Sequence, residues 1–459
     1  MKLLNFVNRR QELDALKKRL GSKEPEFVVI YGRRRIGKTE LIKQFIEGRN
    51  AFYFMAEKQD LRLEAGRFRE KFARRFDTWL TDTLDFEIIF EDVGKFIKKR
   101  GERLIMVIDE FPYWIEKDRD IVSKFQYIWD EILCKCDIML IICGSSVGMM
   151  ETDVLGYRSP LYGRRTSQLR IMPLRFTHIG GFLDYGAEDR VSVYAVAGGV
   201  PAYLKRFQPS LTFEENITRE FFSSDGFLFS ESRTLLLKEL RDVNTYFNIL
   251  LAIADGSTKL GEIAGRAYVD ITNVNKYLNV LINLGLLERI QPTLGKKSDR
   301  VYRIKDNYFR FWVKFVYPFE GDIGIGDNSQ LMENFRGNFN AFLGSAFEAI
   351  SEEFLRESKD TLPFTLTSIG RWWHRGEEID LLALNEKEKK ITFFECKWKT
   401  LSLKEAKKIL YELREKSKLV NWHNEDRKEH FGIIAKEIKE KEKLRKEDFL
   451  AFDLTDFEL

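Results

Sequence analysis

The chain has 459 residues, of which 44% are hydrophobic and 14% aromatic, enough apolar surface to build globular cores. A chain of this length is expected to fold as about three domains. Its 76 Lys and Arg residues nearly balance 72 Asp and Glu residues, for a formal net charge of +4. Overall charge therefore gives no argument for nucleic-acid binding, which must rest on local patches. Charged residues make up 32% of the chain and interleave Lys with Glu, a composition that favours a thermophilic source.

The first strong signal is a complete G-x-x-x-x-G-K-[ST] phosphate-binding loop at residues 32–39. It stands between an apolar strand (27–31) and an amphipathic helix (40–46), so its backbone N–H groups would face nucleotide phosphates at a helix N-terminus. Gly32 and Gly37 allow close approach of the backbone, Lys38 reaches the β- and γ-phosphates, and the Thr39 hydroxyl ligates Mg²⁺. The loop predicts ATP and Mg²⁺ as cofactors. We count the neighbouring Ile36 and Glu40 among the nucleotide contacts.

An apolar strand at residues 104–110 ends in two carboxylates, Asp109 and Glu110. We expect this strand to lie beside the strand of the phosphate loop. Asp109 would then hold the water shell of Mg²⁺, and Glu110 would orient or deprotonate the attacking water.

A third strand, 138–143, ends in a Gly-Ser-Ser turn that would bring Ser145 near the γ-phosphate. Further along, Arg164 and Arg165 offer cations that neutralise transition-state charge, within one subunit or across a subunit boundary. The alternative for either arginine is a surface ion pair.

The four cysteines form neither a metal-binding nor a disulfide pattern. Only Cys134 and Cys136 are close in sequence, and no histidine lies near them to complete a zinc site. We expect reduced thiols and a cytoplasmic protein, since no secretory signal follows Met1. Apolar strands such as 138–143 are far too short to span a bilayer, so no membrane partner is expected.

Helical periods at 180–240 predict a helical lid with an aromatic core. Helices at 246–254, 260–267 and 271–283, followed by strands at 286–290 and 301–304, predict a winged helix. The outward face of its third helix is rich in Asn, which can pair with adenine, and the hairpin turn carries Lys296, Lys297 and Arg300 for phosphates. The same helix has only one cation on that face, Lys276, so DNA contact and packing as a lid both remain open. An aromatic run at 309–317 reads as core, and a Gly- and Asp-rich stretch within 319–334 as a linker.

These motifs, together with residues 6–13, 162–165 and the Gly-Gly-Val-Pro turn at 198–201, occur in the order found in one family. Over about residues 1–310 the chain resembles the archaeal ATPase family, a STAND-type branch of the AAA+-like P-loop ATPases. The resemblance implies that Arg9 and Pro201 lie on the adenine side of the nucleotide and that Arg164 is a sensor or finger. We also expect a homo-oligomer formed or controlled by ATP. Arg10 departs from the family, which commonly has an acid there.

The C-terminal region carries a second group of acids. A helix at 339–355 contains Glu348, a strand at 378–384 contains Asp380, and a strand at 391–398 places Glu395 and Lys397 on one face. A hairpin would bring Asp380 beside Glu395, giving the groups needed for metal-assisted phosphodiester hydrolysis. Asp380 and Glu395 would bind Mg²⁺, and Lys397 would position or activate water. The alternative is a charged hairpin on a solvated face, although acids inside so apolar a strand need a metal or a cation partner.

The pattern Glu348…Asp380…Glu395-x-Lys397 resembles the PD-(D/E)XK nuclease superfamily over about residues 335–440. It is similar to the domain of unknown function that follows many archaeal ATPases. Ile379 precedes Asp380, so the Pro-Asp pair of the motif is absent. The helix at 403–420 carries six cations that would either follow a phosphate backbone or form a solvated face with the interleaved Glu residues.

We therefore expect an α/β protein: a P-loop NTPase domain with a parallel sheet (1–175), a helical lid (176–244), a winged helix (245–318), a linker (319–334) and a restriction-endonuclease-like PD-(D/E)XK domain (335–459). The predicted function is an ATPase coupled to a Mg²⁺-dependent DNA nuclease, with DNA as partner. One alternative is a nucleotide-controlled switch or DNA-binding regulator whose nuclease-like domain is inactive. The other is a protein-remodelling ATPase whose winged helix packs on protein.

Overall fold

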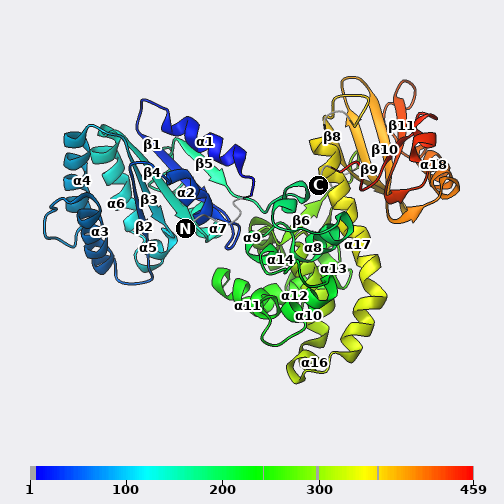
Figure 1. Ribbon diagram of the computed structural model, residues 1–459, viewed down its shortest axis with the longest axis horizontal. Helices are drawn as coiled ribbons and strands as arrows, with labels where there is room; N and C mark the ends of the chain where they lie inside the picture. Colours follow the sequence, from blue (N-terminus) through cyan, green and yellow to red (C-terminus); the bar gives the residue numbers. More distant parts are fainter. Residues whose placement is uncertain (1–6, 241, 296–298, 359–360, 458–459) are drawn as a thin grey trace. The chain divides into compact units, whose positions relative to one another are not determined.

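The computed structural model describes residues 7–240, 242–295, 299–358 and 361–457. The chain divides into two compact units, Met1–Pro173 and Leu174–Leu459, and each is described by itself. Figure 1 follows the chain through both units and labels their helices and strands. Among the described residues, none of the helices combines the length and the apolar character needed to cross a membrane.

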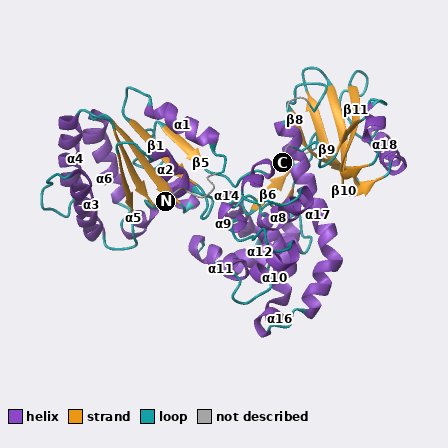
Figure 2. Ribbon diagram, viewed as in Figure 1, coloured by secondary structure: helices purple, strands orange, loops and turns teal. Residues whose placement is uncertain are grey.

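The first unit is built on a five-stranded sheet in which all neighbouring strands are parallel, in the order β2-β3-β4-β1-β5. This confirms the predicted α/β fold with a parallel sheet. Helices cover both faces of the sheet (Figure 2). The strands are β1 (Glu26–Tyr31), β2 (Ala51–Met55), β3 (Leu104–Asp109), β4 (Ile138–Gly144) and β5 (Ser167–Arg170).

The two faces of this sheet are packed differently. On one face, side chains of α1 (Arg10–Leu20) and α2 (Lys38–Ile46), such as Leu16 and Phe45, form a core with alternate residues of the strands. On the other face, aromatic rings dominate; Phe52 of β2 lies 5.2 Å from Phe68, between ring centroids. The helices of that face are α3 (Leu61–Phe76), α4 (Phe86–Arg100), α5 (Pro112–Lys117) and α6 (Ile121–Tyr127).

The strand order corrects one expectation. The strand that ends in Asp109, β3, does not lie beside the phosphate-loop strand β1, because β4 pairs with both and separates them. All three strands are buried on both faces, so their apolar runs are nearly interchangeable and carry no signal for their lateral order. The carboxyl ends of the strands still meet at one edge of the sheet, where the acids remain within reach of the loop.

The second unit begins with helices. The lid segment contains α8 (Ala187–Ala197), α9 (Pro201–Leu204), α10 (Phe213–Phe221) and α11 (Phe227–Glu239). Three helices and an antiparallel strand pair follow, and we call them the winged-helix segment: α12 (Val243–Ala254), α13 (Leu260–Arg266), α14 (Ile271–Asn283), β6 (Leu287–Ile290) and β7 (Val301–Ile304). Its short turn at 291–295 is called the wing. The outward Asn residues of α14 and Lys276 are exposed, whereas Lys296 and Lys297 lie outside the described residues.

The stretch expected to be a linker, 319–334, is helical instead. It contains α16 (Glu320–Ile325) and the start of α17 (Ser329–Glu357). Phe335 and Phe342 stand at helical spacing on α17 and pack on Phe315 of the aromatic run, with ring centroids 5.6 and 5.4 Å apart. Of the Gly and Asp residues that suggested a linker, Gly321, Asp322 and Gly324 lie within α16, whereas Gly326 and Asp327 occupy the turn before α17. Burial of the Phe side chains holds the following helix against the core.

The C-terminal part of the second unit is a mixed five-stranded sheet in the order β12-β11-β10-β9-β8. β8, β9 and β10 are antiparallel neighbours, whereas β10, β11 and β12 run parallel. One face packs against α18 (Leu403–Ser417) through Leu410 and Leu413, and the other packs against α17, with Phe347 lying 5.2 Å from Trp398. The strands are β8 (Ser368–His374), β9 (Glu377–Asn385), β10 (Lys390–Leu401), β11 (Lys428–Ile438) and β12 (Leu450–Phe452).

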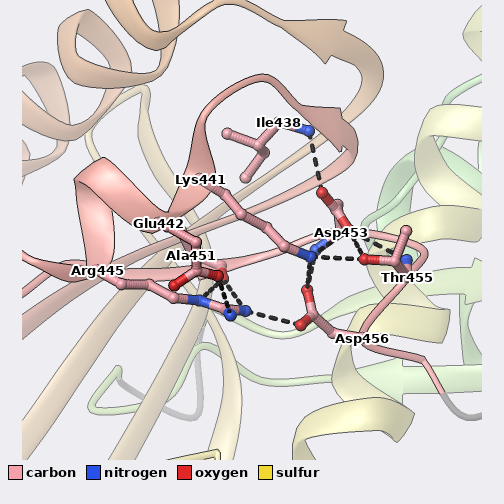
Figure 3. A network of polar contacts seen from close by, with 8 residues as sticks. All are labelled: Ile438, Lys441, Glu442, Arg445, Ala451, Asp453, Thr455 and Asp456. Carbon is pink, nitrogen blue, oxygen red and sulfur yellow. Dashed lines mark hydrogen bonds and ion pairs between the residues drawn. The ribbon is translucent and has the colours of Figure 1, made fainter.

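A polar network fastens the end of the chain to this sheet (Figure 3). The buried carboxylate of Asp453 accepts hydrogen bonds from the backbone N–H of Ile438 at 3.2 Å and from Lys441 at 2.7 Å. Asp456 accepts from Lys441 and from Arg445, each at 2.7 Å. Because these charges are paired and hydrogen-bonded, the segment after β12 can pack on the sheet without an unsatisfied buried acid.

Candidate functional site

The phosphate loop joins β1 to α2, and two of its glycines are required by the backbone. Gly37 is the N-cap of α2 with a left-handed φ of 91°. Gly32 has φ 151°, and a Cβ there would lie 2.4 Å from the carbonyl oxygen of Ile171. Only glycine satisfies both conditions without displacing the backbone. The motif therefore forms a tight loop whose N–H groups open towards the N-terminus of α2.

Lys38 lies buried within the loop. Its Nζ donates hydrogen bonds to the carbonyl oxygens of Gly32 and Arg33, both at 2.8 Å. Burial lowers the pKa of Lys38, while nearby acids, among them Glu110 and Asp109, act in the opposite sense. The ammonium group is thus held at the mouth of the loop by neutral acceptors. Phosphate oxygens are stronger, charged acceptors for the same donors.

The strand-end acid Asp109 is completely buried and meets the loop directly. Its Oδ2 accepts a hydrogen bond from the Thr39 hydroxyl at 2.8 Å and another from the Tyr53 hydroxyl at 2.7 Å. Burial and the Asp109 charge together raise the pKa of Tyr53, which keeps the hydroxyl a donor. Tyr53 was missed in the sequence because the pairing of β2 with β3 leaves no mark in a local pattern.

Glu110 adopts a left-handed backbone conformation, with φ 56°, immediately after β3. Its Oε2 accepts hydrogen bonds from the Ser145 hydroxyl at 2.8 Å and from the Ser145 backbone N–H at 3.2 Å. The structure therefore brings Glu110 and Ser145 together, as the two strand ends predicted. A non-glycine residue in this conformation is strained, and such strain is concentrated at functional sites.

The other residues assigned to the nucleotide are placed as follows. Arg9 is buried and donates to the carbonyl oxygens of Ile36 at 3.1 Å and Met172 at 2.6 Å, which ties the N-terminal segment to the phosphate loop. The Ile36 side chain is buried in the core of the unit. Glu40 lies on α2 beside Lys43. Pro201 belongs to the second unit, where it is the first residue of α9.

Arg164 is held by an acid rather than left free. Its Nε donates to both carboxylate oxygens of Asp130, at 2.9 and 2.8 Å, and its Nη1 donates to the carbonyl oxygen of Pro160 at 2.7 Å. This arrangement matches the ion-pair alternative for Arg164. The guanidinium fixes the loop after β4 in this conformation of the chain.

The C-terminal acids converge on Lys397. Its Nζ lies 2.5 Å from Oε2 of Glu395 and 3.3 Å from Oδ2 of Asp380. The backbone N–H of Cys396 also donates to Asp380, at 2.8 Å. Burial raises the pKa of Glu395, and the charge of Asp380 adds to this shift. Burial alone would lower the pKa of Lys397, but the two carboxylates outweigh it and raise that pKa.

Two further cations hold the acids of this cluster. Lys416 of α18 donates to Oε1 of Glu395 at 3.0 Å. Arg371 of β8 forms an ion pair with Glu348, whose pKa is raised by burial. Neither cation had been assigned to the site, because Lys416 reads as one of many charges on α18 and Arg371 carries no motif. Glu348 thus faces Arg371, and the described residues hold no group of three His, Cys, Asp or Glu side chains arranged for a metal ion.

The oxygen atoms that the C-terminal cluster and the nucleotide site offer are nevertheless of the kind that binds Mg²⁺. Carboxylate oxygens are the ligands that Mg²⁺ prefers, and protein sites for this ion often supply only one or two of them. Asp380 and Glu395 meet that requirement in the C-terminal cluster. In the nucleotide site, the Thr39 hydroxyl and the Asp109 carboxylate do the same.

Fold and phosphate loop together define a P-loop ATPase. ATPase domains found predominantly in Archaea match residues 6–207, and a family of archaeal and bacterial proteins of unknown function matches residues 312–409. An uncharacterised protein of Methanocaldococcus jannaschii is 39% identical over 98% of this chain and its own full length. A Walker-type ATPase of Pyrococcus abyssi has the same fold over 67% of this chain and 95% of its own, with a TM-score of 0.52 and 20% identity.

The chain therefore belongs to the same family as this Methanocaldococcus jannaschii protein, and its residues 6–207 form an ATPase domain of the kind found predominantly in Archaea. A shorter match links it to an uncharacterised ATP-binding protein of Methanocaldococcus jannaschii, 43% identical over 47 residues, which are 10% of this chain and 80% of that protein.

Proposed function

We propose that the protein hydrolyses ATP and that its C-terminal domain is a Mg²⁺-dependent nuclease of the PD-(D/E)XK kind acting on DNA. The observation that carries the nuclease proposal is the convergence of Asp380, Glu395 and Lys397 around one point. The order of elements around them supports it: a helix, an antiparallel hairpin bearing the acids, a second helix and a parallel strand.

In the ATPase site, the loop N–H groups and Lys38 bind the phosphates. Thr39 and Asp109 would hold Mg²⁺, which supplies charge neutralisation at the phosphates. Glu110 orients the attacking water and accepts its proton, while Ser145 fixes the Glu110 carboxylate. Arg9 and Pro201 belong on the adenine side. We further propose that ATP controls assembly of the chain into a homo-oligomer.

In the C-terminal site, Asp380 and Glu395 would hold Mg²⁺, which polarises the scissile phosphate. Lys397 donates to the attacking water and orients it towards phosphorus. The water oxygen forms a bond to phosphorus as the bond to one ester oxygen breaks. The proton lost by the water ends on that ester oxygen, so one product carries a phosphate and the other a hydroxyl. Glu348 lies at the edge of the same cluster, as a further acid for the cation or the water.

The test compares wild type with Asp380→Ala and Lys397→Met on linear and branched DNA in the presence of Mg²⁺. Wild type should cut at least one substrate, and both variants should leave it intact. Asp426→Ala is the matched control, because Asp426 is an exposed acid of the same domain and lies outside the cluster. DNA left equally intact, or cut equally, by wild type and Asp380→Ala would end the nuclease proposal and leave the ATPase proposal standing.

A second function is favoured by a specific observation. Each acid of the cluster already faces a cation: Arg371 on Glu348, Lys397 on Asp380, and Lys416 on Glu395. An acid cluster neutralised in this way suits a nucleotide-controlled switch in which the nuclease-like domain serves binding or assembly. Calorimetry separates the two functions: an absence of Mg²⁺ or Mn²⁺ binding that depends on Asp380 would favour the switch.

A further inference from the structure

The C-terminal cluster balances three acids with three cations, and only one of those cations belongs to the proposed catalytic set. Lys397 is that residue. Arg371 and Lys416 are additional. Arg371 forms an ion pair with the carboxylate of Glu348 and also lies 3.5 Å from the carboxylate of Glu378. The side chains of Arg371 and Glu348 are 17% and 20% exposed, so water screens this ion pair only weakly. A divalent cation that binds to the cluster is therefore repelled by the positive charges of Arg371 and Lys416.

The backbone beside Arg371 is irregular on the neighbouring strand. Gly370 of β8 pairs with Leu382 of β9 and Trp372 pairs with Ile379, so Arg371 alone stands opposite two residues of β9, Asp380 and Leu381. This is a β-bulge on β9, and bulges occur preferentially beside active sites, where they redirect side chains. Without the extra residue, strict alternation along β9 would fix the side directions of all its residues, Asp380 included.

The wing of the winged-helix segment lies directly against β8 at this point. The backbone N–H of Thr293 donates a hydrogen bond to the carbonyl oxygen of Arg371 at 2.7 Å. On the preceding residue, Gly370, a Cβ would come within 2.6 Å of the Thr293 hydroxyl oxygen, so the wing is packed against the strand backbone. Arg371 therefore joins the wing to the acid cluster.

We propose that Arg371 is a positioning residue that withholds Glu348 from a bound cation, and that the wing keeps Arg371 in this position. The inference rests on the proposed function, since it supposes that the cluster binds a divalent cation. Loss of the Arg371 charge leaves the cluster with a net negative charge and frees a third carboxylate. Release of the wing removes a hydrogen bond that fixes the backbone of Arg371, and the Arg371 side chain then swings away from Glu348.

The experiment measures Mn²⁺ binding to the full chain by calorimetry and counts only the binding that Asp380→Ala abolishes. Arg371→Met should bind Mn²⁺ about tenfold more tightly than wild type, a modest value for coupling between a charge and an adjacent site. Arg371→Gln, which also lacks the charge, is the second variant in case the first does not fold. Thr293→Pro removes the N–H donor and should shift the affinity in the same direction by a smaller factor. Thr293→Ala keeps that donor and should match wild type.

The outcomes are distinguishable. Tighter binding in Arg371→Met and Thr293→Pro, with Thr293→Ala unchanged, supports the inference in full. If wild type binds Mn²⁺ and neither Arg371 variant binds it more tightly, the inference is wrong and the proposed function stands. If Thr293→Pro and Thr293→Ala bind Mn²⁺ with the same affinity, the wing does not hold Arg371 in position. No Asp380-dependent binding in any variant would overturn both the inference and the proposed nuclease.

Discussion

Removal of one hydroxyl, in Tyr53→Phe, should weaken the binding of Mg²⁺-ATP without affecting the binding of metal-free ATP. In the structure Tyr53 and Thr39 donate to the same oxygen of Asp109, at 2.7 and 2.8 Å. When Thr39 turns its oxygen towards Mg²⁺, Asp109 loses that donor and depends more strongly on Tyr53. The substitution therefore costs more in the metal-bound state than in the free protein.

The size of the effect follows from the kind of bond. A hydrogen bond to a charged group contributes about 1.5–3 kcal/mol. Asp109 keeps the backbone N–H of Glu110, which donates to its other oxygen at 2.9 Å, so the lower end applies. About 1.5 kcal/mol corresponds to roughly a tenfold change in affinity.

The assay is the titration of a fluorescent ATP analogue, once with excess Mg²⁺ and once with a chelator. Tyr53→Phe should bind about tenfold more weakly than wild type with Mg²⁺ and equally well with the chelator. The control is Tyr127→Phe, since Tyr127 is 43% exposed on α6 and should affect neither titration. A loss of the same size under both conditions, or no loss with Mg²⁺, would refute the idea that Tyr53 acts through the metal-binding acid.

Three further predictions concern the loop, the water and the lid. Lys38→Ala should abolish nucleotide binding in the same titration, because the phosphates lose their buried cation. Glu110→Gln should bind ATP normally but hydrolyse it about a hundredfold more slowly or worse, as expected for loss of a general base; unchanged phosphate release would show that another residue orients the water. Gly199→Ala should destabilise the lid segment by about 3 kcal/mol or more, since its Cβ would lie 1.7 Å from the carbonyl oxygen of Leu174. Thermal unfolding checks this last prediction against Gly186→Ala, whose Cβ would meet no atom within 4 Å; equal melting of the two variants would contradict it.

The parts of the protein that could be predicted from the sequence are those determined by short segments of the chain. The phosphate loop needs glycine at two fixed positions because only glycine adopts the required backbone angles. Its geometry therefore follows from the amino-acid sequence of the loop alone. The alternation of Glu395 and Lys397 along one strand, and the helical spacing of the lid and winged-helix segment, are equally local. These local rules suffice to place those elements and their outward residues.

The parts that were not readable depend on contacts between distant segments. β4 separates β1 from β3 because three equally apolar strands carry no signal for their order. Tyr53 reaches its site only through that order, Arg371 through the position of β8 beside β9, and Lys416 through the packing of α18. The helices at 319–334 were missed for a different reason: the Gly and Asp residues of α16 and of the turn after it outweighed the aromatic spacing that follows.

Helix α17 gives the second unit a physical link between lid and acid cluster. It carries Glu348 to Arg371, and little more than one turn later Glu353 accepts from the Tyr194 hydroxyl and the Phe176 backbone N–H, both at 3.0 Å. With 29 residues the helix is about 43 Å long, and its N-terminal half is held by the aromatic run. A lid movement that displaces Tyr194 must therefore either break these buried bonds or carry α17 with it. In the second case Glu348 moves relative to the strand that carries Arg371, and the state of the lid reaches the acid cluster through α17.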